Sequence, residues 1–209
     1  MQLIGMLDSP YVRRVAVSLL LLEIPFEHQA LSVFRTFERF RAINPVVKAP
    51  SLVCDDGTVL MDSTLILDYA EALAAPRTLM PRELAQRRAS LRTIGLALAA
   101  CEKSVQLIYE QELRPPEKRH EPWVARVTGQ LGASYRELEA DLLRGRSSPE
   151  ESFGAAEVAT AIAWHFTQRM LPGSVPESDF PRLHALSDHA EQLPAFVAAP
   201  HGEGTVRPS

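Results

Sequence analysis

The chain has 209 residues, of which 46% are hydrophobic and 23% are charged, so it has enough apolar material for one large core or two modest ones. Its formal net charge of −4 argues against a nucleic-acid-binding surface, which usually needs a basic face. The longest apolar stretch, residues 15–22, is far shorter than the roughly 20 residues that span a bilayer. Because no signal-peptide pattern precedes it either, we expect a cytoplasmic protein without a membrane partner.

The two cysteines give no sign of a metal or redox site. Cys54 and Cys101 lie far apart in apolar or helical settings. The sequence contains no CxxC pair and no Cys/His cluster with zinc-ligand spacing. We therefore expect buried, reduced thiols and no bound metal.

The first part of the chain, up to about residue 75, predicts strands and helices in the order β-α-β-α-β-β-α. Asp8-Ser9-Pro10 indicates a helix start, because a capping side chain precedes proline at the first helical position. Asp55-Asp56-Gly57 between two apolar runs predicts a hairpin. The first two strands are separated by a helix and should be parallel. The expected strands cover residues 2–6, 26–31, 50–54 and 58–61, and the expected helices cover residues 10–23, 37–43 and 63–73.

Beyond residue 76 the sequence predicts helices alone. Apolar residues recur at helical spacing, and the segment 155–170 is apolar nearly all round, as is typical of a helix at the centre of a bundle. The expected helices cover residues 82–113, 121–143, 155–170, 181–191 and 194–198, followed by a polar tail from His201. The predicted fold class is α/β plus all-α, with an α/β domain at residues 1–76, a linker at 77–84 and an all-helical domain at 85–209.

Ser9 is the first candidate for chemistry, because it stands where the first strand gives way to the first helix. Helix capping alone would explain a serine here. A hydroxyl at this position could also donate a hydrogen bond to a ligand thiolate, which is worth about 1.5–3 kcal/mol, with about 0.3–1 kcal/mol more from the helix dipole. Together these would lower a thiol pKa of about 8.5 by one to two units or more.

Two further segments combine polar groups with special backbone positions. Pro50 opens a strand, and a cis Ala49–Pro50 bond would turn the Ala49 backbone toward an extended peptide, although a plain strand-start proline is the simpler interpretation. Asp62 and Ser63 open the third helix. They fit an N-cap, and they also fit a site that takes a carboxylate at the helix end and an ammonium at Asp62.

In order and spacing along this frame, three segments resemble the cytosolic glutathione transferase family, in particular its bacterial serine-type members. The segments are Ser9-Pro10-Tyr11-Val12-Arg13-Arg14-Val15, Asn44-Pro45-Val46-Val47-Lys48-Ala49-Pro50, and Asp62-Ser63 followed by Ile66 and Tyr69-Ala70-Glu71. The resemblance extends over nearly the whole chain. It implies a thioredoxin-like βαβαββα domain followed by a helical bundle.

The resemblance also implies roles for single residues. Ser9 would support the glutathione thiolate, and the Ala49 backbone, before the cis-proline Pro50, would bond the cysteinyl unit. Asp62 and Ser63 would hold the γ-glutamyl end. Lys48 would reach the glycyl carboxylate, for which Arg35 is a weaker candidate. Ala49 stands where the family commonly has Val or Leu, and Asp62 where it often has Glu.

The implied activity is attack of bound glutathione, as a co-substrate, on a small hydrophobic electrophile in a detoxification reaction. Tyr11 and Tyr109 are candidates for the electrophile pocket, and Tyr11 is also an alternative to Ser9 as thiol partner. Glutathione-dependent isomerisation, disulfide reduction and a non-catalytic binding module remain alternatives. A homodimer is expected from the resemblance alone.

Overall fold

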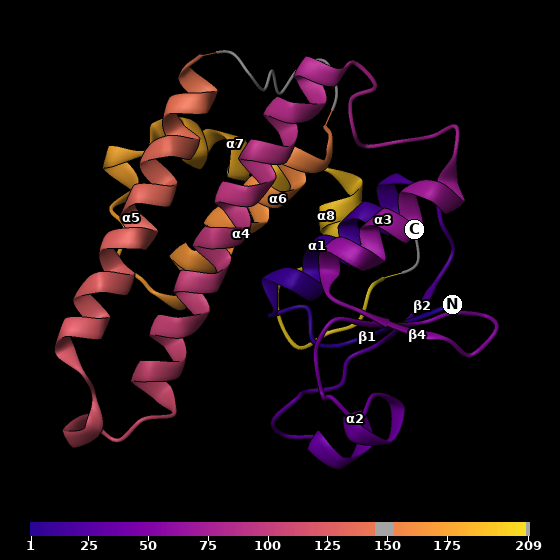
Figure 1. The fold of residues 1–209 in the computed structure, drawn as a ribbon, viewed down its shortest axis with the longest axis horizontal. Coiled ribbons are helices and arrows are strands. Elements are labelled where there is room, and N and C mark those ends of the chain that lie inside the picture. The colour runs from indigo at the N-terminus through magenta and orange to yellow at the C-terminus, as the bar shows by residue number, and fades with distance from the viewer. Residues whose placement is uncertain (145–152, 208–209) are drawn as a thin grey trace. The chain divides into compact units, whose positions relative to one another are not determined.

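The computed structural model describes residues 1–144 and 153–207. The chain forms two compact units (Figure 1). The amino-terminal unit consists of Met1–Leu79 together with the residues from Glu191 onward, and the helical unit is Met80–Ala190.

The amino-terminal unit is built on a four-stranded sheet in the order β2-β1-β3-β4. The strands are β1 (Gln2–Ile4), β2 (Glu27–Gln29), β3 (Ser51–Val53) and β4 (Val59–Met61). β1 pairs with β2 in parallel and with β3 antiparallel, so that Leu3 lies between His28 and Leu52. The parallel pair and the β3–β4 hairpin are confirmed. The first two strands are shorter than predicted, because their flanking residues leave the ladder for loops.

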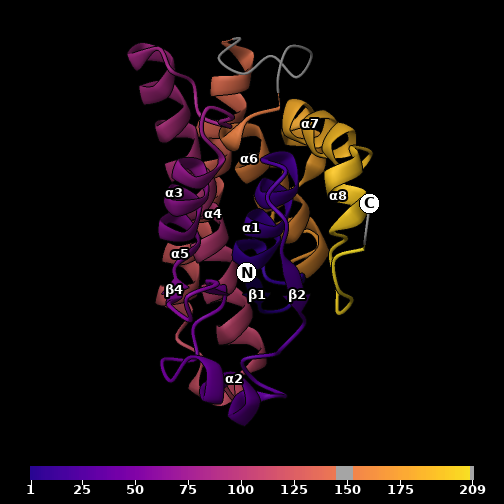
Figure 2. The same cartoon turned by 90° about the vertical axis from the view of Figure 1, so that its right-hand side faces the viewer.

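Helices cover both faces of this sheet. α1 (Pro10–Leu21) and α3 (Ser63–Ala74) lie on one face and α2 (Phe37–Ile43) on the other (Figures 1 and 2). Apolar side chains of α1 are fully buried, as at Val12 and Val15. On the opposite face, Phe40 of α2 packs in a buried cluster with Ile4 and Leu31.

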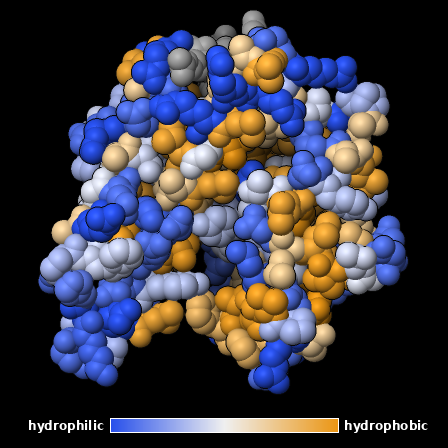
Figure 3. All heavy atoms as spheres, viewed as in Figure 1, coloured by the Kyte–Doolittle hydropathy of each residue, from blue (hydrophilic) through white to orange (hydrophobic). Residues whose placement is uncertain are grey.

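Hydrophobic side chains also reach the surface around α2. Phe34 is 56% exposed, Phe37 is 43% exposed and Val46 is 62% exposed. Figure 3 shows hydrophobic surface gathered over α2. An exposed apolar area of this kind is a common feature of surfaces that bind a partner or ligand.

Within the amino-terminal unit, a buried arginine of α1 binds the carboxyl-terminal segment. Arg13 of α1 is 1% exposed. It donates to both carboxylate oxygens of Glu191 at 2.7 Å and to the carbonyl of Ala199 at 2.8 Å, and its guanidinium lies over the Phe196 ring of α8 (Pro194–Ala198). These contacts replace water around a buried charge, which would otherwise be costly to bury.

In its described residues, the helical unit has the predicted helices up to that at residues 181–191 and two short 3₁₀ turns. Its long helices are α4 (Leu84–Glu112), α5 (Glu121–Leu143) and α6 (Ala155–Met170), with η1 (Pro116–Lys118) between α4 and α5. η2 (Glu177–Asp179) and α7 (Pro181–Glu191) follow. Most residues of α6 are buried, as its apolar circumference predicts. α6 has one of the two hydrogen bonds of a capping box: the backbone N–H of Gly154, before the helix, donates to Glu157 Oε2 at 3.0 Å.

Polar side chains buried between these helices satisfy one another. The Tyr135 hydroxyl donates to the Ala163 carbonyl at 2.8 Å and lies 2.6 Å from Thr167 Oγ1, which also contacts Ser104 Oγ at 2.7 Å. The Tyr135 ring meets Trp164 edge to face, with centroids 5.2 Å apart.

None of the helices in residues 1–144 and 153–207 combines the length and apolar character needed to cross a bilayer.

Candidate functional site

Ser9 is the N-cap of α1, and its hydroxyl is only loosely engaged there. Its backbone is extended, and Oγ accepts from the Val12 N–H at 3.5 Å, a long contact for a cap. A hydroxyl that accepts in its cap still has its hydrogen to donate. The capping role and a ligand-binding role are therefore compatible at this residue.

The Ala49–Pro50 bond is cis, and the backbone of Ala49 is open. Ala75–Pro76 is a second cis bond. In the part of the chain that the structure describes, no hydrogen bond joins the Ala49 N–H or C=O to another backbone group. Both groups are therefore available to an extended peptide laid beside them.

Gly5, which sequence reasoning did not single out, lets Ala49 approach the start of α1. Its φ is +141°, a conformation that side chains other than glycine rarely adopt. A Cβ at this position would lie 2.5 Å from Val12 Cγ2 and 3.3 Å from Ala49 Cβ. The available signal was a glycine inside the predicted first strand, at residues 2–6.

Lys48, Asp62 and Ser63 lie together at the start of α3. Asp62 has a φ of +70° and caps the helix, accepting from the Thr64 N–H at 2.9 Å. Its other oxygen lies 3.6 Å from Lys48 Nζ, and both side chains are about half exposed. A strained, non-glycine backbone is often retained where a side chain has a binding role.

Ser63 has a buried cationic neighbour that the sequence did not reveal. Arg14 is 5% exposed and donates from Nη1 to Ser63 Oγ at 3.2 Å. Arg13 is buried as well. Arg13 and Arg14 follow Val12 in α1. The apolar residues of this helix predict burial of the face that they occupy, and not of the face that carries the arginines.

Arg35 lies in a different charged group from Lys48. Its guanidinium pairs with Glu203 of the carboxyl-terminal segment at 2.7 Å, and both side chains are mostly exposed. The pKa of Asp8 is raised, mainly because the carboxyl group is partly buried. The charge of Arg35 lowers this pKa and the charge of Glu203 raises it. Within the described residues, no hydrogen bond or ion pair joins Arg35 to Lys48, Asp62 or Ser63.

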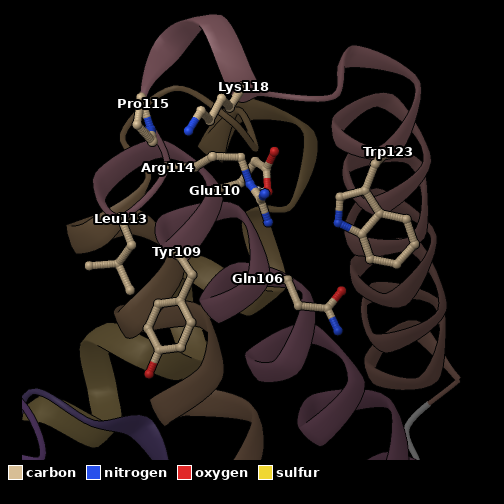
Figure 4. Close-up of a pocket in the computed structure, with 8 residues that line it drawn as sticks. All are labelled: Gln106, Tyr109, Glu110, Leu113, Arg114, Pro115, Lys118 and Trp123. Atoms are coloured by element: carbon tan, nitrogen blue, oxygen red, sulfur yellow. Dashed lines mark hydrogen bonds and ion pairs between the residues drawn. The ribbon is translucent and has the colours of Figure 1, made fainter.

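The two tyrosines named as electrophile candidates belong to different units. Tyr11 lies in the first turn of α1 and is partly exposed. Tyr109 belongs to α4, is 45% exposed, and lines a cavity of about 510 Å³ in the helical unit. Figure 4 shows that Tyr109 and Gln106 point to different sides of α4, with Gln106 directed toward Trp123 of α5.

The charge in this cavity is balanced around one buried acid. Glu110 lies beside Arg114 (Figure 4) and accepts from Arg114 Nε at 2.8 Å. It also accepts from the His120 N–H at 3.1 Å. Burial alone raises the pKa of Glu110, but these hydrogen bonds and the charges of Arg114 and Arg119 hold it below its ordinary value.

Neither cysteine forms a disulfide in the part of the chain that the structure describes. Cys101 is buried, whereas Cys54 is partly exposed instead of buried as expected. Burial, with the nearby charge of Asp56, raises the pKa of the Cys54 thiol. Among the residues described, no three His, Cys, Asp or Glu side chains are grouped as metal ligands.

Comparisons with known proteins give one consistent family. Residues 3–78 match the family model described as the glutathione S-transferase N-terminal domain. The uncharacterized GST-like protein YibF of Escherichia coli is 25% identical over 174 residues, which are 83% of this chain and 86% of the relative.

Two solved structures match over nearly the whole chain. A glutathione transferase family member from Pseudomonas fluorescens, with bound glutathione, is 29% identical with a TM-score of 0.83, covering 100% of this chain and 98% of that one. A glutathione S-transferase from Methylobacterium radiotolerans, in complex with glutathione sulfonate, is 25% identical with a TM-score of 0.86, covering 96% and 95%.

The fold and these similarities define a protein with a thioredoxin-like amino-terminal domain and an all-helical carboxyl-terminal domain. Residues 3–78 match the amino-terminal domain of the glutathione S-transferases, and over nearly its whole length the chain resembles members of that family in sequence and fold.

Proposed function

We propose that this protein binds glutathione and activates its sulfur as a thiolate for attack on a small hydrophobic electrophile. The observation that carries the proposal is the Ser9 hydroxyl at the amino end of α1, which accepts a long 3.5 Å contact from the Val12 N–H in its cap. Similarity to structures that contain glutathione or glutathione sulfonate supports the choice of co-substrate.

The tripeptide would be held by the Ala49 backbone, by the Asp62–Ser63 pair and by Lys48. The open N–H and C=O of Ala49, next to Pro50, suit the cysteinyl backbone in an extended arrangement. Asp62 and Ser63 at the α3 amino end suit the ammonium and carboxylate of the γ-glutamyl group.

Lys48 is the better candidate for the glycyl carboxylate. It is half exposed, and it pairs with the half-exposed Asp62 at 3.6 Å, a weak surface contact. Arg35 would have to exchange its 2.7 Å contact with Glu203 for the ligand.

Catalysis would come from thiolate stabilisation and proximity, without a covalent protein intermediate. A hydroxyl that donates to the thiolate stabilises the deprotonated sulfur, so the thiol pKa falls and the thiolate fraction near neutral pH rises. The hydrogen bond alone is worth about 1.5–3 kcal/mol.

Replacement of Ser9 by alanine tests this proposal. We expect Ser9→Ala to lower turnover about 10- to 100-fold, as the loss of about 1.5–3 kcal/mol implies, while the Kd for glutathione changes little. The pKa of bound glutathione, followed by thiolate absorbance, should rise. Tyr11→Phe is the matched control and should keep turnover. Full activity in Ser9→Ala together with a loss in Tyr11→Phe would transfer the role to Tyr11.

The same assays separate the alternatives. A screen of electrophiles, a maleylacetoacetate-type substrate and mixed disulfides would distinguish conjugation from isomerisation and disulfide reduction. Calorimetry that finds no glutathione binding would favour a non-catalytic binding module. We further propose that the protein acts as a homodimer.

A further inference from the structure

Arg14 makes a buried contact with the first two residues of α3. Its Nη1 donates to Ser63 Oγ at 3.2 Å and to Thr64 Oγ1 at 3.4 Å. We propose that Arg14 is a positioning residue for the γ-glutamyl carboxylate of glutathione, acting through the Ser63 hydroxyl and through its own charge. The inference rests on the proposed function, because it assumes that glutathione occupies this site.

The contact determines which way the Ser63 hydroxyl can point. A guanidinium only donates hydrogen bonds, so Ser63 Oγ accepts from Arg14 and its single hydrogen must be directed elsewhere. Among the described residues, no hydrogen bond donated by Ser63 Oγ accompanies this contact. Ser63 is 3% exposed, which restricts its side chain further. The hydroxyl is thus oriented in advance as a donor to a ligand oxygen.

The charge of Arg14 acts in the same direction as the helix. α3 is 12 residues long, and its amino end carries a partial positive charge that favours an anion. Arg14 places a full positive charge directly behind that end. Because Arg14 is only 5% exposed, water and salt screen this charge less than they screen a surface charge.

The adjacent Arg13 serves a different part of the molecule. Consecutive residues of a helix point about 100° apart. Arg13 accordingly reaches Glu191 and Ala199 in the carboxyl-terminal segment, whereas Arg14 reaches Ser63 and Thr64. Arg13 is therefore a matched control: it is the same residue type, in the same helix turn and equally buried.

A purely structural role for Arg14, holding α1 against α3, makes a different prediction. Loss of packing would weaken the binding of any ligand at this site to a similar degree. A role toward the carboxylate would weaken only ligands that carry it. The decisive comparison is between glutathione and 4-aminobutyryl-cysteinylglycine, which keeps the amine and lacks the α-carboxylate.

Isothermal titration of the full chain with these two ligands tests the inference. We expect Arg14→Met to weaken glutathione binding about tenfold, equivalent to about 1.4 kcal/mol, and to change binding of the analogue less than about twofold. Arg14→Lys, which keeps the charge and a donor, should recover part of the loss. Arg13→Met should leave the ratio of the two affinities at its wild-type value, whatever it does to the melting temperature.

A second measurement uses glutathione alone. If Arg14 acts partly through Ser63, the loss in the Arg14→Met, Ser63→Ala double variant should be smaller than the product of the two single losses. Equal loss of both ligands in Arg14→Met, or unchanged glutathione affinity, would overturn the inference. Absence of glutathione binding by the wild-type chain would instead overturn the proposed function.

Discussion

His28 shows how two hydrogen bonds can determine the state of a single ring. Nε2 lies 2.8 Å from the Gly5 carbonyl and must donate to it, so Nδ1 carries the lone pair that accepts from the Val206 N–H at 3.1 Å. Burial lowers the pKa of His28, and the hydrogen bond to Gly5 offsets part of that effect. Protonation at Nδ1 would remove the acceptor for Val206. The folded protein therefore favours the neutral ring.

This preference predicts a pH dependence of stability. The unfolded chain, with an ordinary histidine pKa of about 6.5, binds more protons than the folded chain just below that pH. The free energy of unfolding should therefore fall as pH falls through the lowered pKa of His28. Urea unfolding of the wild type and of His28→Gln between about pH 5 and pH 8 would check this. The difference between the two curves should shrink toward acid, whereas a constant difference would contradict it. His184→Gln, an exposed histidine, is the control.

The residues that could be predicted are those whose role depends on local sequence. Ser9 precedes a proline at a helix start, and Asp62-Ser63 follows a strand, so both could be found from nearby residues alone. Arg14 could not, because its contact with Ser63 joins residues on two helices that a whole βαββ segment separates. Nothing near Arg14 in the sequence distinguishes it from a solvent-facing arginine.

At the scale of elements, one carboxylate joins α5 to α7. Glu139 of α5 is 8% exposed. Its two oxygens accept from the N–H groups of Arg182 and Leu183, both at 3.0 Å. These N–H groups belong to the first turn of α7 and have no partner within the helix. The negative charge also suits the positive end of the helix.

Removing this carboxylate should destabilise the protein. We expect Glu139→Ala to lower the free energy of unfolding by about 2 kcal/mol, because it removes a cap and leaves two N–H groups of the first turn, of which the Leu183 N–H is buried, without their acceptor. Glu137→Ala, two residues away, removes an exposed carboxylate paired with Arg92 and should cost less than about 1 kcal/mol. Thermal and urea unfolding would measure both. Equal effects of the two variants would show that Glu139 does not act as a cap.

Elements with a strong periodic pattern were predicted well, and short strands less well. The helices at residues 37–43, 121–143 and 155–170 begin and end as predicted. The strands at the start of the chain end earlier than their apolar runs suggest, since Gly5 leaves the ladder at a φ that a strand does not have. The end of a strand depends on its neighbours in the sheet, which a local pattern does not specify.

On the scale of the whole molecule, the carboxyl-terminal segment could not be assigned from sequence. The short helix at residues 194–198 was expected to close the helical domain. Instead, Arg13 of α1 binds the residues on either side of it: Glu191, which is 178 residues away along the chain, and Ala199, which is 186 residues away. From His201 onward the sequence predicts only a polar tail. Its Val206 and Glu203 contact His28 and Arg35. Only long-range contacts determine where such a segment packs.

The proposed homodimer is also a property of the whole molecule, and α3 offers a surface for it. Leu65 is 63% exposed, Tyr69 is 40% exposed and Leu73 is 51% exposed. Their spacing of four residues places them on one side of the helix, while Ile66 and Ala70 face the core. An apolar stripe on a helix that already buries its other side suits an interface between two copies.

We expect the wild-type chain to be a dimer by light scattering and the Leu65→Glu, Leu73→Glu double variant to be a monomer. In a twofold interface each substitution places its charge in the contact twice, so the repulsion acts on both copies. Phe37→Glu places the same charge in the exposed apolar area around α2 and should leave the dimer intact. A monomeric wild type would refute the dimer itself. A dimer that survives in the double variant but dissociates in Phe37→Glu would move the interface from α3 to α2.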